Sequence, residues 1–316
     1  MARAYSSRLV LGMVLTLFAA QTQAADDAAF TTQRDVVYGR KHGLAMTCNV
    51  FAPKENANGA AVVWVVSGGW ISAHALAEAE FPFSPAKELC RRGYTVFAVV
   101  HGSQPKFTIP EILEDMHRAV RFIRSHAADY KIDPHRIGIT GGSAGGHLSL
   151  MQGTAGKEGD AAAKDEVERA SSRVQAVACF FPPTDFLNYG QPGENALGRG
   201  ILKNFQAPFD FHELDAKNGR AGVYVPITDE AKVLAIGREI SPLNHVSADD
   251  PPTLIIHGDK DTLVPIQQAE IIVAKLKEAG VPAELRVKAG ASHGWPKIEQ
   301  DIPHLADWFD KHLAKK

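Results

Sequence analysis

The strongest signal for the fold class of this chain is the segment Arg136-Ile137-Gly138-Ile139-Thr140-Gly141-Gly142-Ser143-Ala144-Gly145-Gly146-His147. Residues 136–140 form an apolar run typical of a buried strand, and residues 147–151 have the pattern of a helix start. A serine in a Gly-x-Ser-x-Gly turn between a strand and a helix sits on a strained backbone, so its neighbours must be small enough for both elements to pass close together. Ser143 is therefore a candidate nucleophile.

An acid and a base follow Ser143, each directly after a predicted strand. Strand 253–257 leads into a turn with Asp259 and Asp261, and the last strand leads into a turn with His293. Catalytic groups of open α/β sheets gather at the carboxyl ends of the strands, and a serine hydroxyl needs a base and a third group that orients it. We predict that Ser143 attacks, His293 accepts the proton and Asp261 orients the imidazole. Asp259 is the alternative acid, its other role being to hydrogen-bond the turn.

A glycine-rich loop, Ser67-Gly68-Gly69-Trp70, follows the predicted strand 60–66. Glycines allow backbone N–H groups to turn toward one point, so Gly68 and Gly69, together with the N–H of Ala144, are predicted donors of an oxyanion hole. The alternative is that the two glycines only make a tight turn. Trp70 and Trp295 are candidate substrate-binding residues that wall an acyl pocket, or else they pack the loops.

Strand-like and helix-like runs alternate along the chain, which predicts an α/β fold with a mostly parallel sheet flanked by helices. A hairpin is expected first, from residues 36–38 and 45–51. The strands expected after it are 60–66, 95–100, 136–140, 174–180, 253–257 and 284–287, and the expected helices include 84–92, 112–123, 266–279 and 302–313. Residues 186–245 interrupt this alternation and are too long for an ordinary connection. They are predicted to be an insertion over the catalytic face, with a peripheral excursion as the alternative.

Residues 1–24 have the features of a secretory signal peptide. Arg3 and Arg8 give a positive start, residues 9–20 are apolar, and Thr22-Gln23-Ala24 offers small residues for cleavage. An uncleaved membrane anchor is the alternative, although the apolar run is shorter than the ~20 residues that a span needs. We therefore expect one domain over residues 25–316, export to the periplasm or the medium, and no stable membrane insertion after cleavage.

Charge and cysteine content exclude several classes of protein. The 34 basic and 36 acidic residues nearly balance and form no basic run, so no nucleic-acid partner is predicted. The three cysteines, Cys48, Cys90 and Cys179, fall in strand, helix and strand segments. An odd number leaves at least one thiol unpaired, and we expect three buried thiols rather than a disulfide. Their spacing indicates no metal site, and neither a metal nor a cofactor is predicted.

With these residues in place, the chain resembles the bacterial esterase/lipase branch of the α/β-hydrolases, which is similar to hormone-sensitive lipase and to carbohydrate-ester esterases such as feruloyl and acetylxylan esterases. The segments that carry the resemblance are 50–53, 132–137, 142–147, 171–177, 241–243 and 257–265. The resemblance implies an α/β-hydrolase fold, a small-molecule or carbohydrate ester as substrate, and no cofactor. It also implies that the second aspartate of the turn, Asp261, is the triad acid.

One departure from the family pattern lies in the oxyanion loop. The family usually has His-Gly-Gly-Gly-Trp after its third strand, where this chain has Val66-Ser67-Gly68-Gly69-Trp70. The two donor glycines are kept, but the histidine that shapes the loop is replaced. The replacement therefore bears on the geometry of the oxyanion hole rather than on the presence of its donors.

The expected function is that of an exported serine hydrolase that cleaves carboxylic esters with short to medium acyl groups. The resemblance points to acetyl or feruloyl groups on carbohydrate. An amidase or peptidase with the same triad is one alternative. Prolyl-oligopeptidase-type enzymes share the triad order, but they generally carry a propeller before the hydrolase domain, and the residues before Val36 leave no room for one. The other is a catalytically silent binding protein, favoured by Val66 and Ser67 but opposed by the presence of Ser143, Asp261 and His293 together.

Overall fold

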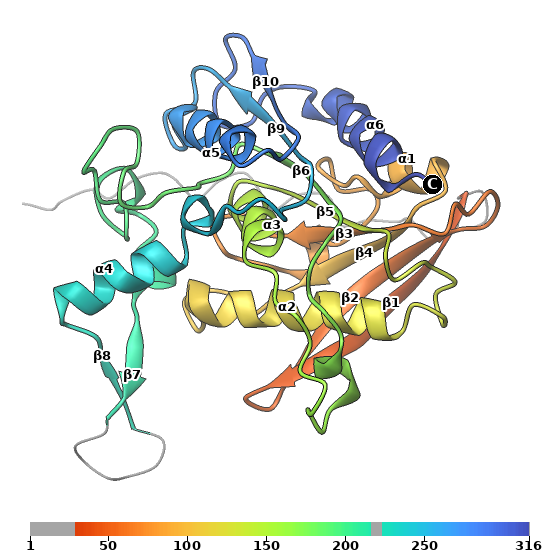
Figure 1. The fold of residues 1–316 in the computed structure, drawn as a ribbon, viewed down its shortest axis with the longest axis horizontal. Helices are drawn as coiled ribbons and strands as arrows, with labels where there is room; N and C mark the ends of the chain where they lie inside the picture. The colour runs from red at the N-terminus through yellow and green to blue at the C-terminus, as the bar shows by residue number, and fades with distance from the viewer. Residues whose placement is uncertain (1–28, 216–222, 316) are drawn as a thin grey trace, which may run out of the picture.

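The structure is a computed structural model that describes residues 29–215 and 223–315. Within them the chain forms an eight-stranded sheet with the order β1-β2-β4-β3-β5-β6-β9-β10, and a separate pair β7-β8 (Figure 1). The strands are β1 (Phe30–Lys41), β2 (Leu44–Pro53), β3 (Ala61–Val66), β4 (Thr95–Val100), β5 (Ile137–Gly142), β6 (Ala176–Phe180), β7 (His212–Leu214), β8 (Tyr224–Pro226), β9 (Thr253–Gly258) and β10 (Ala283–Lys288).

The sheet is antiparallel at its first edge and parallel elsewhere. Strand β2 pairs antiparallel with both β1 and β4, whereas all pairs from β4 to β10 are parallel. Strands β3 and β4 are buried along their whole length, as expected for apolar runs in a sheet covered on both faces. The parallel arrangement brings the turns after β3, β5, β9 and β10 to one edge of the sheet.

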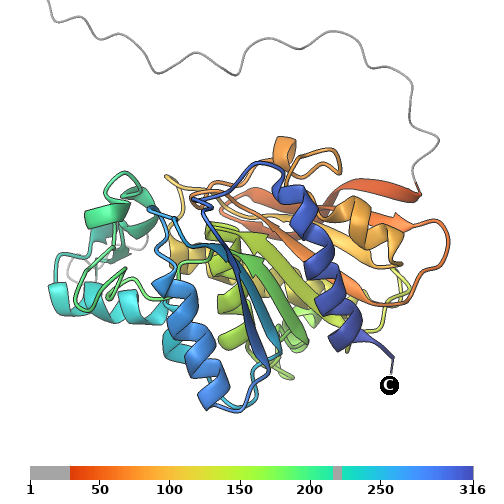
Figure 2. The same cartoon turned by 90° about the horizontal axis from the view of Figure 1, so that it is seen from above.

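Helices cover both faces of the sheet. They are α1 (Ala86–Arg91), α2 (Ile109–Ser125), α3 (Ala144–Thr154), α4 (Glu230–Glu239), α5 (Gln267–Glu278) and α6 (Ile302–Leu313), with short 3₁₀ turns η1 (His74–Leu76), η2 (Glu166–Arg169), η3 (Gly200–Leu202), η4 (Ala207–Phe209), η5 (Pro242–His245) and η6 (Ile298–Asp301). Helices α2, α3 and α5 bury one core cluster against one face, while α1 and α6 bury a second cluster against the other (Figure 2). This α/β architecture agrees with the prediction.

The predicted elements differ from the observed ones mainly at their ends. Strand β4 and helix α6 have the predicted bounds. The hairpin is longer than predicted, because β1 runs along the exposed edge of the sheet and its polar residues pair with β2 as far as Phe30↔Pro53. Helix α3 begins at Ala144 rather than at His147, since the two glycines between them weaken the helical pattern without breaking the helix.

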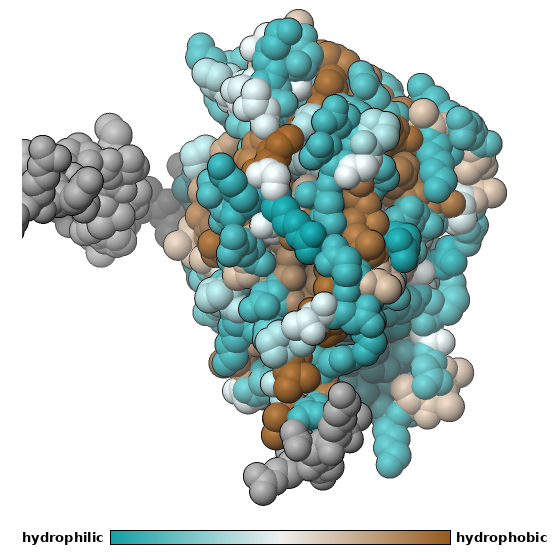
Figure 3. Space-filling model, turned by 90° about the vertical axis from the view of Figure 1, so that its left-hand side faces the viewer, coloured by the Kyte–Doolittle hydropathy of each residue, from teal (hydrophilic) through white to brown (hydrophobic). Residues whose placement is uncertain are grey.

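The predicted insertion, residues 186–245, lies at one end of the molecule. Helix α4 and the β7-β8 pair stand out from the sheet there, and apolar side chains form small separate areas among hydrophilic ones on that end (Figures 1 and 3). Its root packs inward, where Phe186, Phe205 and Phe209 surround the ring of Trp70. The described part of the insertion therefore reaches the predicted catalytic edge through its root, while the hairpin points away.

Two further predictions concern cysteines and the N-terminus. Cys48, Cys90 and Cys179 are free and buried, as expected. The predicted signal peptide, residues 1–24, lies outside the described residues. Among the helices that the structure describes, none combines the length and the apolar character that crossing a membrane requires.

Candidate active site

Ser143 occupies the sharp turn between β5 and α3. Its backbone has φ 55° and ψ −121°, a strained conformation for a residue other than glycine. The N–H of Ser143 donates to the carbonyl of Phe180 at 3.0 Å. A Cβ on Gly141 would lie 2.6 Å from the backbone of Gly145, and one on Gly145 would lie 2.8 Å from the Val65 carbonyl oxygen. The glycines of the motif therefore permit the close strand–helix packing that presents Ser143.

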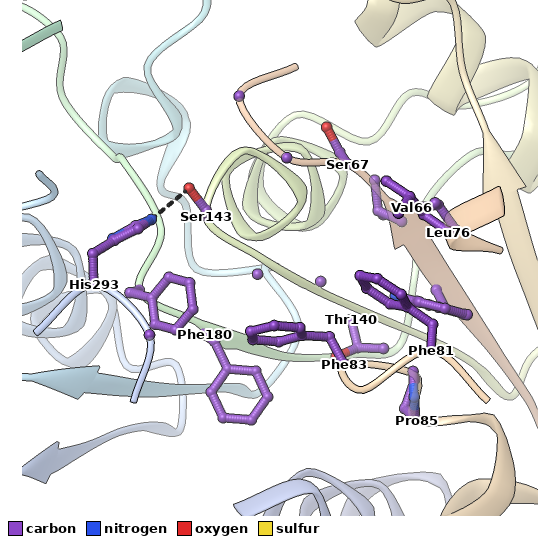
Figure 4. A pocket seen from close by; sticks show the side chains of 18 of the residues that line it. Val66, Ser67, Leu76, Phe81, Phe83, Pro85, Thr140, Ser143, Phe180 and His293 are labelled. Carbon is purple, nitrogen blue, oxygen red and sulfur yellow. Dashed lines mark hydrogen bonds between the residues drawn. The ribbon is translucent and has the colours of Figure 1, made fainter. Parts of the chain in front are cut away.

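The structure brings Ser143, His293 and Asp261 together from the turns after β5, β10 and β9. Nε2 of His293 lies 2.9 Å from Oγ of Ser143 (Figure 4), and Nδ1 of His293 lies 2.7 Å from Oδ2 of Asp261. Both distances are within the hydrogen-bonding range that proton transfer and orientation of a base require. The side chain of Asp261 is fully buried, whereas that of His293 is 22% exposed and so reaches the substrate side.

The buried carboxylate of Asp261 is held by several donors. Its Oδ1 accepts hydrogen bonds from the N–H groups of Leu263 at 2.9 Å and Val264 at 2.8 Å. Burial by itself raises the pKa of Asp261, but the hydrogen bonds from His257, His293 and the Val264 N–H outweigh it and hold this pKa well below its usual value. An ionised Asp261 favours the His293 tautomer with the proton on Nδ1, which leaves Nε2 free to accept one.

His257 is a supporting residue that the sequence analysis missed. It is the penultimate residue of β9 and completely buried, with Nε2 3.3 Å from Oδ2 of Asp261 and 2.8 Å from the carbonyl oxygen of Val264. The His257-Gly258-Asp259 motif placed this residue beside the turn, but only the fold shows that its ring faces the carboxylate. His257 therefore fixes the orientation of Asp261.

Asp259, the alternative acid, has a different position. Its Oδ1 accepts the N–H of Gly290 at 2.6 Å, which ties the turn after β9 to the turn after β10. Within the described residues no hydrogen bond or ion pair joins Asp259 to His293, whose Nδ1 pairs with Asp261 instead. This is the turn-stabilising role that the sequence analysis named as the other possibility.

The predicted oxyanion hole is only partly formed as expected. The N–H of Gly68 donates to the carbonyl of Ile71 at 2.9 Å, and the Ile71 N–H donates back at 3.0 Å. The prediction of Gly68 as an oxyanion donor is therefore wrong here, because this reciprocal pair closes a tight turn. Gly69, with φ 55°, has an N–H without an acceptor in the described chain. Ala144 is the first residue of α3, where N–H groups lack an intrahelical acceptor.

A neighbouring loop holds the oxyanion loop in place of the family's histidine. The N–H of Ser72 donates to Oγ of Ser103 at 2.7 Å. The side chain of Gln104 donates to the carbonyl of Gly69 at 2.8 Å, and the Gln104 N–H donates to the carbonyl of Trp70 at 3.2 Å. These bonds fix the backbone around Gly69, so that the replacement by Val66 does not leave the loop unsupported.

Trp70 does not have the predicted substrate-binding position. It is 2% exposed and lies outside the cavity lining, and its Nε1 donates to Nδ1 of His147 at 3.2 Å. Nε2 of His147 in turn donates to the carbonyl of Ile240 at 2.7 Å, and burial lowers the pKa of His147 to about 4. Trp70 therefore joins the oxyanion loop to the elbow helix and to the insertion.

Trp295 also lies behind the cavity rather than in its wall. Its Nε1 donates to Oδ2 of Asp301 at 2.7 Å, and its ring packs against Phe180 and Phe181 with centroid distances of 5.9 and 5.7 Å. Trp295 is absent from the cavity lining, to which Phe180 and Phe181 contribute, so it has the packing role that was the alternative to substrate binding.

A cavity of about 380 Å³ opens beside Ser143 (Figure 4). Six of its lining residues that the sequence analysis missed are Leu76, Phe81, Phe83, Pro85, Phe180 and Phe181. Phe180 ends the central strand β6 and Phe181 follows it, a position that marks both in the sequence, whereas the contribution of the loop before α1 depends on the fold. Within the described residues no three His, Cys, Asp or Glu side chains gather closely enough to hold a metal ion.

The fold and this geometry agree with comparisons to known proteins. A sequence profile of the BD-FAE family matches residues 48–276, which include Ser143 and Asp261 and end before His293. The chain belongs to the BD-FAE family. The predicted resemblance to the esterase/lipase branch of the α/β-hydrolases is thereby confirmed.

This BD-FAE member is similar to curated esterases of Mycobacterium tuberculosis. The probable carboxylic ester hydrolase LipM is 31% identical over 247 residues, which cover 77% of this chain and 51% of LipM. Esterase LipQ is 29% identical over 188 residues, which cover 60% of this chain and 39% of LipQ. The chain thus spans about half or less of the length of these relatives.

Solved structures give the same fold for this BD-FAE member. A truncated carbohydrate esterase from gut microbiota has a TM-score of 0.72 at 27% identity, with 92% of this chain and 99% of that chain covered. A thermophilic esterase from Thermogutta terrifontis has a TM-score of 0.63 at 24% identity, with 89% and 91% covered. The α/β-hydrolase fold is therefore confirmed.

Proposed function

We propose that this BD-FAE member hydrolyses carboxylic esters by a Ser-His-Asp acyl-enzyme mechanism. The observation that carries the proposal is the continuous contact chain from Ser143 through His293 to Asp261, at 2.9 and 2.7 Å, beside an apolar cavity. The names of LipM, LipQ and the gut carbohydrate esterase support an ester as the substrate.

In the first half of the reaction, Ser143 forms the acyl-enzyme. Nε2 of His293 accepts the proton of the Ser143 hydroxyl while Oγ attacks the ester carbonyl carbon. The imidazolium that results is stabilised by ionised Asp261. His293 then donates the proton to the departing alcohol oxygen as the C–O bond breaks, which leaves the acyl group on Ser143.

Water releases the acyl group in the second half. His293 accepts a proton from water as the water oxygen attacks the acyl carbonyl, and it returns this proton to Oγ of Ser143 as the acid leaves. In both halves the negative charge on the carbonyl oxygen is stabilised by the N–H groups of Gly69 and Ala144. Removal of one oxyanion donor in a serine hydrolase reduces the rate by about 10²–10³-fold.

The proposed substrates carry short to medium acyl groups, with acetyl or feruloyl groups on carbohydrate as examples. The support comes from the resemblance to carbohydrate-ester esterases and from the 27% identity to the gut carbohydrate esterase. We also propose export by way of residues 1–24, supported by Arg3, Arg8, the apolar run and the small residues before Ala25.

A direct test compares the protein with Ser143→Ala on p-nitrophenyl acetate and hexanoate. We expect hydrolysis by the wild type, a loss of more than about 10⁴-fold in Ser143→Ala, and no loss in Ser125→Ala, a matched control at the exposed end of α2. Labelling of Ser143 by a fluorophosphonate is measured in parallel. Cleavage of p-nitroanilides instead of esters would favour an amidase, and a folded protein without turnover or labelling would favour the silent binding protein.

Export is tested on the full chain in a Gram-negative host. We expect a soluble product in the periplasm or medium whose first residue is Ala25, read by mass spectrometry. An intact Met1 in the membrane fraction would instead indicate the uncleaved anchor.

A further inference from the structure

The cavity beside Ser143 lies on the face of the sheet that α1 and α6 cover. Its floor includes Trp64 and Val66 of β3 and Thr140 of β5, which share that face because alternate residues of a strand point to the same side. Gly138 is two residues before Thr140 and so faces the same side of the sheet. A Cβ on Gly138 would lie 2.7 Å from Phe309 of α6, which shows that this is the face covered by α6. The opposite wall comes from the segment 74–85, which connects β3 to α1.

The chemistry of this lining is apolar. Among the described lining residues there is no Asp, Glu, Lys or Arg, and aromatic and aliphatic side chains supply most of the wall, among them Trp64, Leu76, Phe81, Phe83, Phe180 and Leu305. The volume of about 380 Å³ lies within the usual range of small-molecule sites. A two-carbon acetyl group would leave most of this space unfilled, and sugar hydroxyls would find few partners in it.

The position of the general base separates the two sides of the ester. His293 must reach the leaving alcohol oxygen to protonate it, so the alcohol part lies toward His293. Leu76, Phe81 and Val66 lie on the other side of Ser143 from His293 (Figure 4). The deep part of the cavity is therefore on the acyl side of the reacting carbonyl.

We propose that this cavity binds the acyl part of the ester and selects an extended apolar acyl group of about six carbons or more over acetyl. The inference rests on the esterase function proposed above and narrows its acyl range: feruloyl and other medium or aryl acyl groups remain candidate substrates, and acetyl becomes the weaker one. The shared chemistry is an apolar chain or ring next to the carbonyl, which either an aliphatic or an aryl acyl group supplies. Leu76, Phe81 and Phe83 are the specificity-determining residues of the wall.

The size of the expected effect follows from burial of methylene groups. Each methylene that leaves water for an apolar pocket increases kcat/KM by about fourfold, provided that it is buried fully. The four methylenes that separate acetate from hexanoate therefore give an increase of up to about 10²-fold.

Leu76→Trp is designed to shorten the cavity. Leu76 is half-buried in η1 and its side chain lines the cavity, so a larger ring there occupies the space of a long acyl chain. Leu44→Trp is the matched control, because Leu44 is 39% exposed at the start of β2 and outside the lining. Phe83→Ala, at a wall position that is 43% exposed, is the second variant and removes a wall without adding bulk.

The experiment varies the acyl and alcohol parts separately. Wild type and the three variants are assayed on p-nitrophenyl acetate, butyrate, hexanoate, octanoate and cinnamate, and on acetates of methanol, butanol and octanol in a pH-stat. We expect kcat/KM of the wild type to rise from acetate to hexanoate, and Leu76→Trp to lose at least about tenfold on octanoate while acetate changes by less than about threefold. Phe83→Ala should weaken octanoate only, and Leu44→Trp should match the wild type.

Several results would overturn the inference. A wild type that prefers acetate to both octanoate and cinnamate refutes selection of an extended acyl group. A Leu76→Trp effect on the alcohol series instead of the acyl series would assign the cavity to the alcohol. A preference for cinnamate over octanoate would support the inference and would identify an aryl rather than an aliphatic acyl group as the substrate. Absence of any ester hydrolysis and of fluorophosphonate labelling is a different outcome, since it refutes the esterase function itself.

Discussion

The two aspartates of the turn after β9 form a matched pair for substitution by asparagine. In Asp261, Oδ1 accepts the N–H groups of Leu263 and Val264, and Oδ2 faces Nδ1 of His293 at 2.7 Å. In Asp261→Asn the amide oxygen must stay with the two N–H donors, so the NH₂ group takes the place of Oδ2. An NH₂ group there is a donor and cannot accept the Nδ1 proton of His293.

The consequence is a change of tautomer. His293 would carry its proton on Nε2 and present it to Ser143, so that it no longer serves as a base. In serine proteases with a Ser-His-Asp triad, replacement of the triad aspartate by asparagine reduces kcat by about 10⁴-fold. We expect a loss of that order for Asp261→Asn. For Asp259→Asn we expect less than about threefold, since the amide oxygen still accepts the Gly290 N–H.

Steady-state hydrolysis of p-nitrophenyl butyrate measures both variants, and thermal unfolding monitored by circular dichroism checks that they fold. The reasoning fails if Asp261→Asn keeps a tenth or more of the wild-type kcat. It fails equally if Asp259→Asn has the larger loss, because the acid of the triad would then be the residue that the structure ties to Gly290.

Two further predictions concern the buried histidines. Trp70→Phe should lower the free energy of unfolding by about 1–3 kcal/mol, because it leaves Nδ1 of His147 buried without its donor; an unchanged urea midpoint would contradict this. Burial lowers the pKa values of His101, His117 and His147 to about 4, below the unfolded value of about 6.5. The three histidines therefore make their full contribution to the free energy of unfolding above pH 6.5, and this contribution is lost as the pH falls toward 4. Urea unfolding at pH 5.5 should show a stability about 4 kcal/mol below that at pH 7.5, and equal midpoints would refute it.

Much of the fold was predictable because its signals are local. Continuous apolar runs mark the buried parallel strands, and β4 has the predicted bounds. The edge strand β1 carries no such signal, since most of its side chains face solvent and its pairing is made by backbone groups. The triad residues were also predictable in position, because each follows a strand and parallel strands end at one edge of the sheet.

The parts of the site that the sequence did not predict depend on where a backbone N–H group or a ring points, and the residue type alone does not determine this. Gly68 and Gly69 are alike in the sequence, yet the N–H of Gly68 turns back to Ile71 while that of Gly69 finds no acceptor within residues 29–215 and 223–315. Trp70 is an aromatic residue of the kind that often walls a pocket, but its backbone has a positive φ of 60° and its ring packs on Phe209 of the insertion root, with 5.4 Å between the centroids. Such differences arise from backbone dihedrals that several loops fix together.

The network around Trp70 gives the insertion a second role, besides the contribution of Phe205 to the cavity wall. His147 belongs to α3, which begins next to Ser143, and it joins the Trp70 indole of the oxyanion loop to the Ile240 carbonyl at the end of the insertion. Because the elbow helix and the oxyanion loop must hold Ala144 and Gly69 at one point, a bridge between them preserves the geometry on which transition-state stabilisation depends. In the proposed mechanism the insertion root therefore acts on the reaction through the position of these two N–H groups, whereas Leu76, Phe81 and Phe83 of the segment 74–85 act on the choice of acyl group.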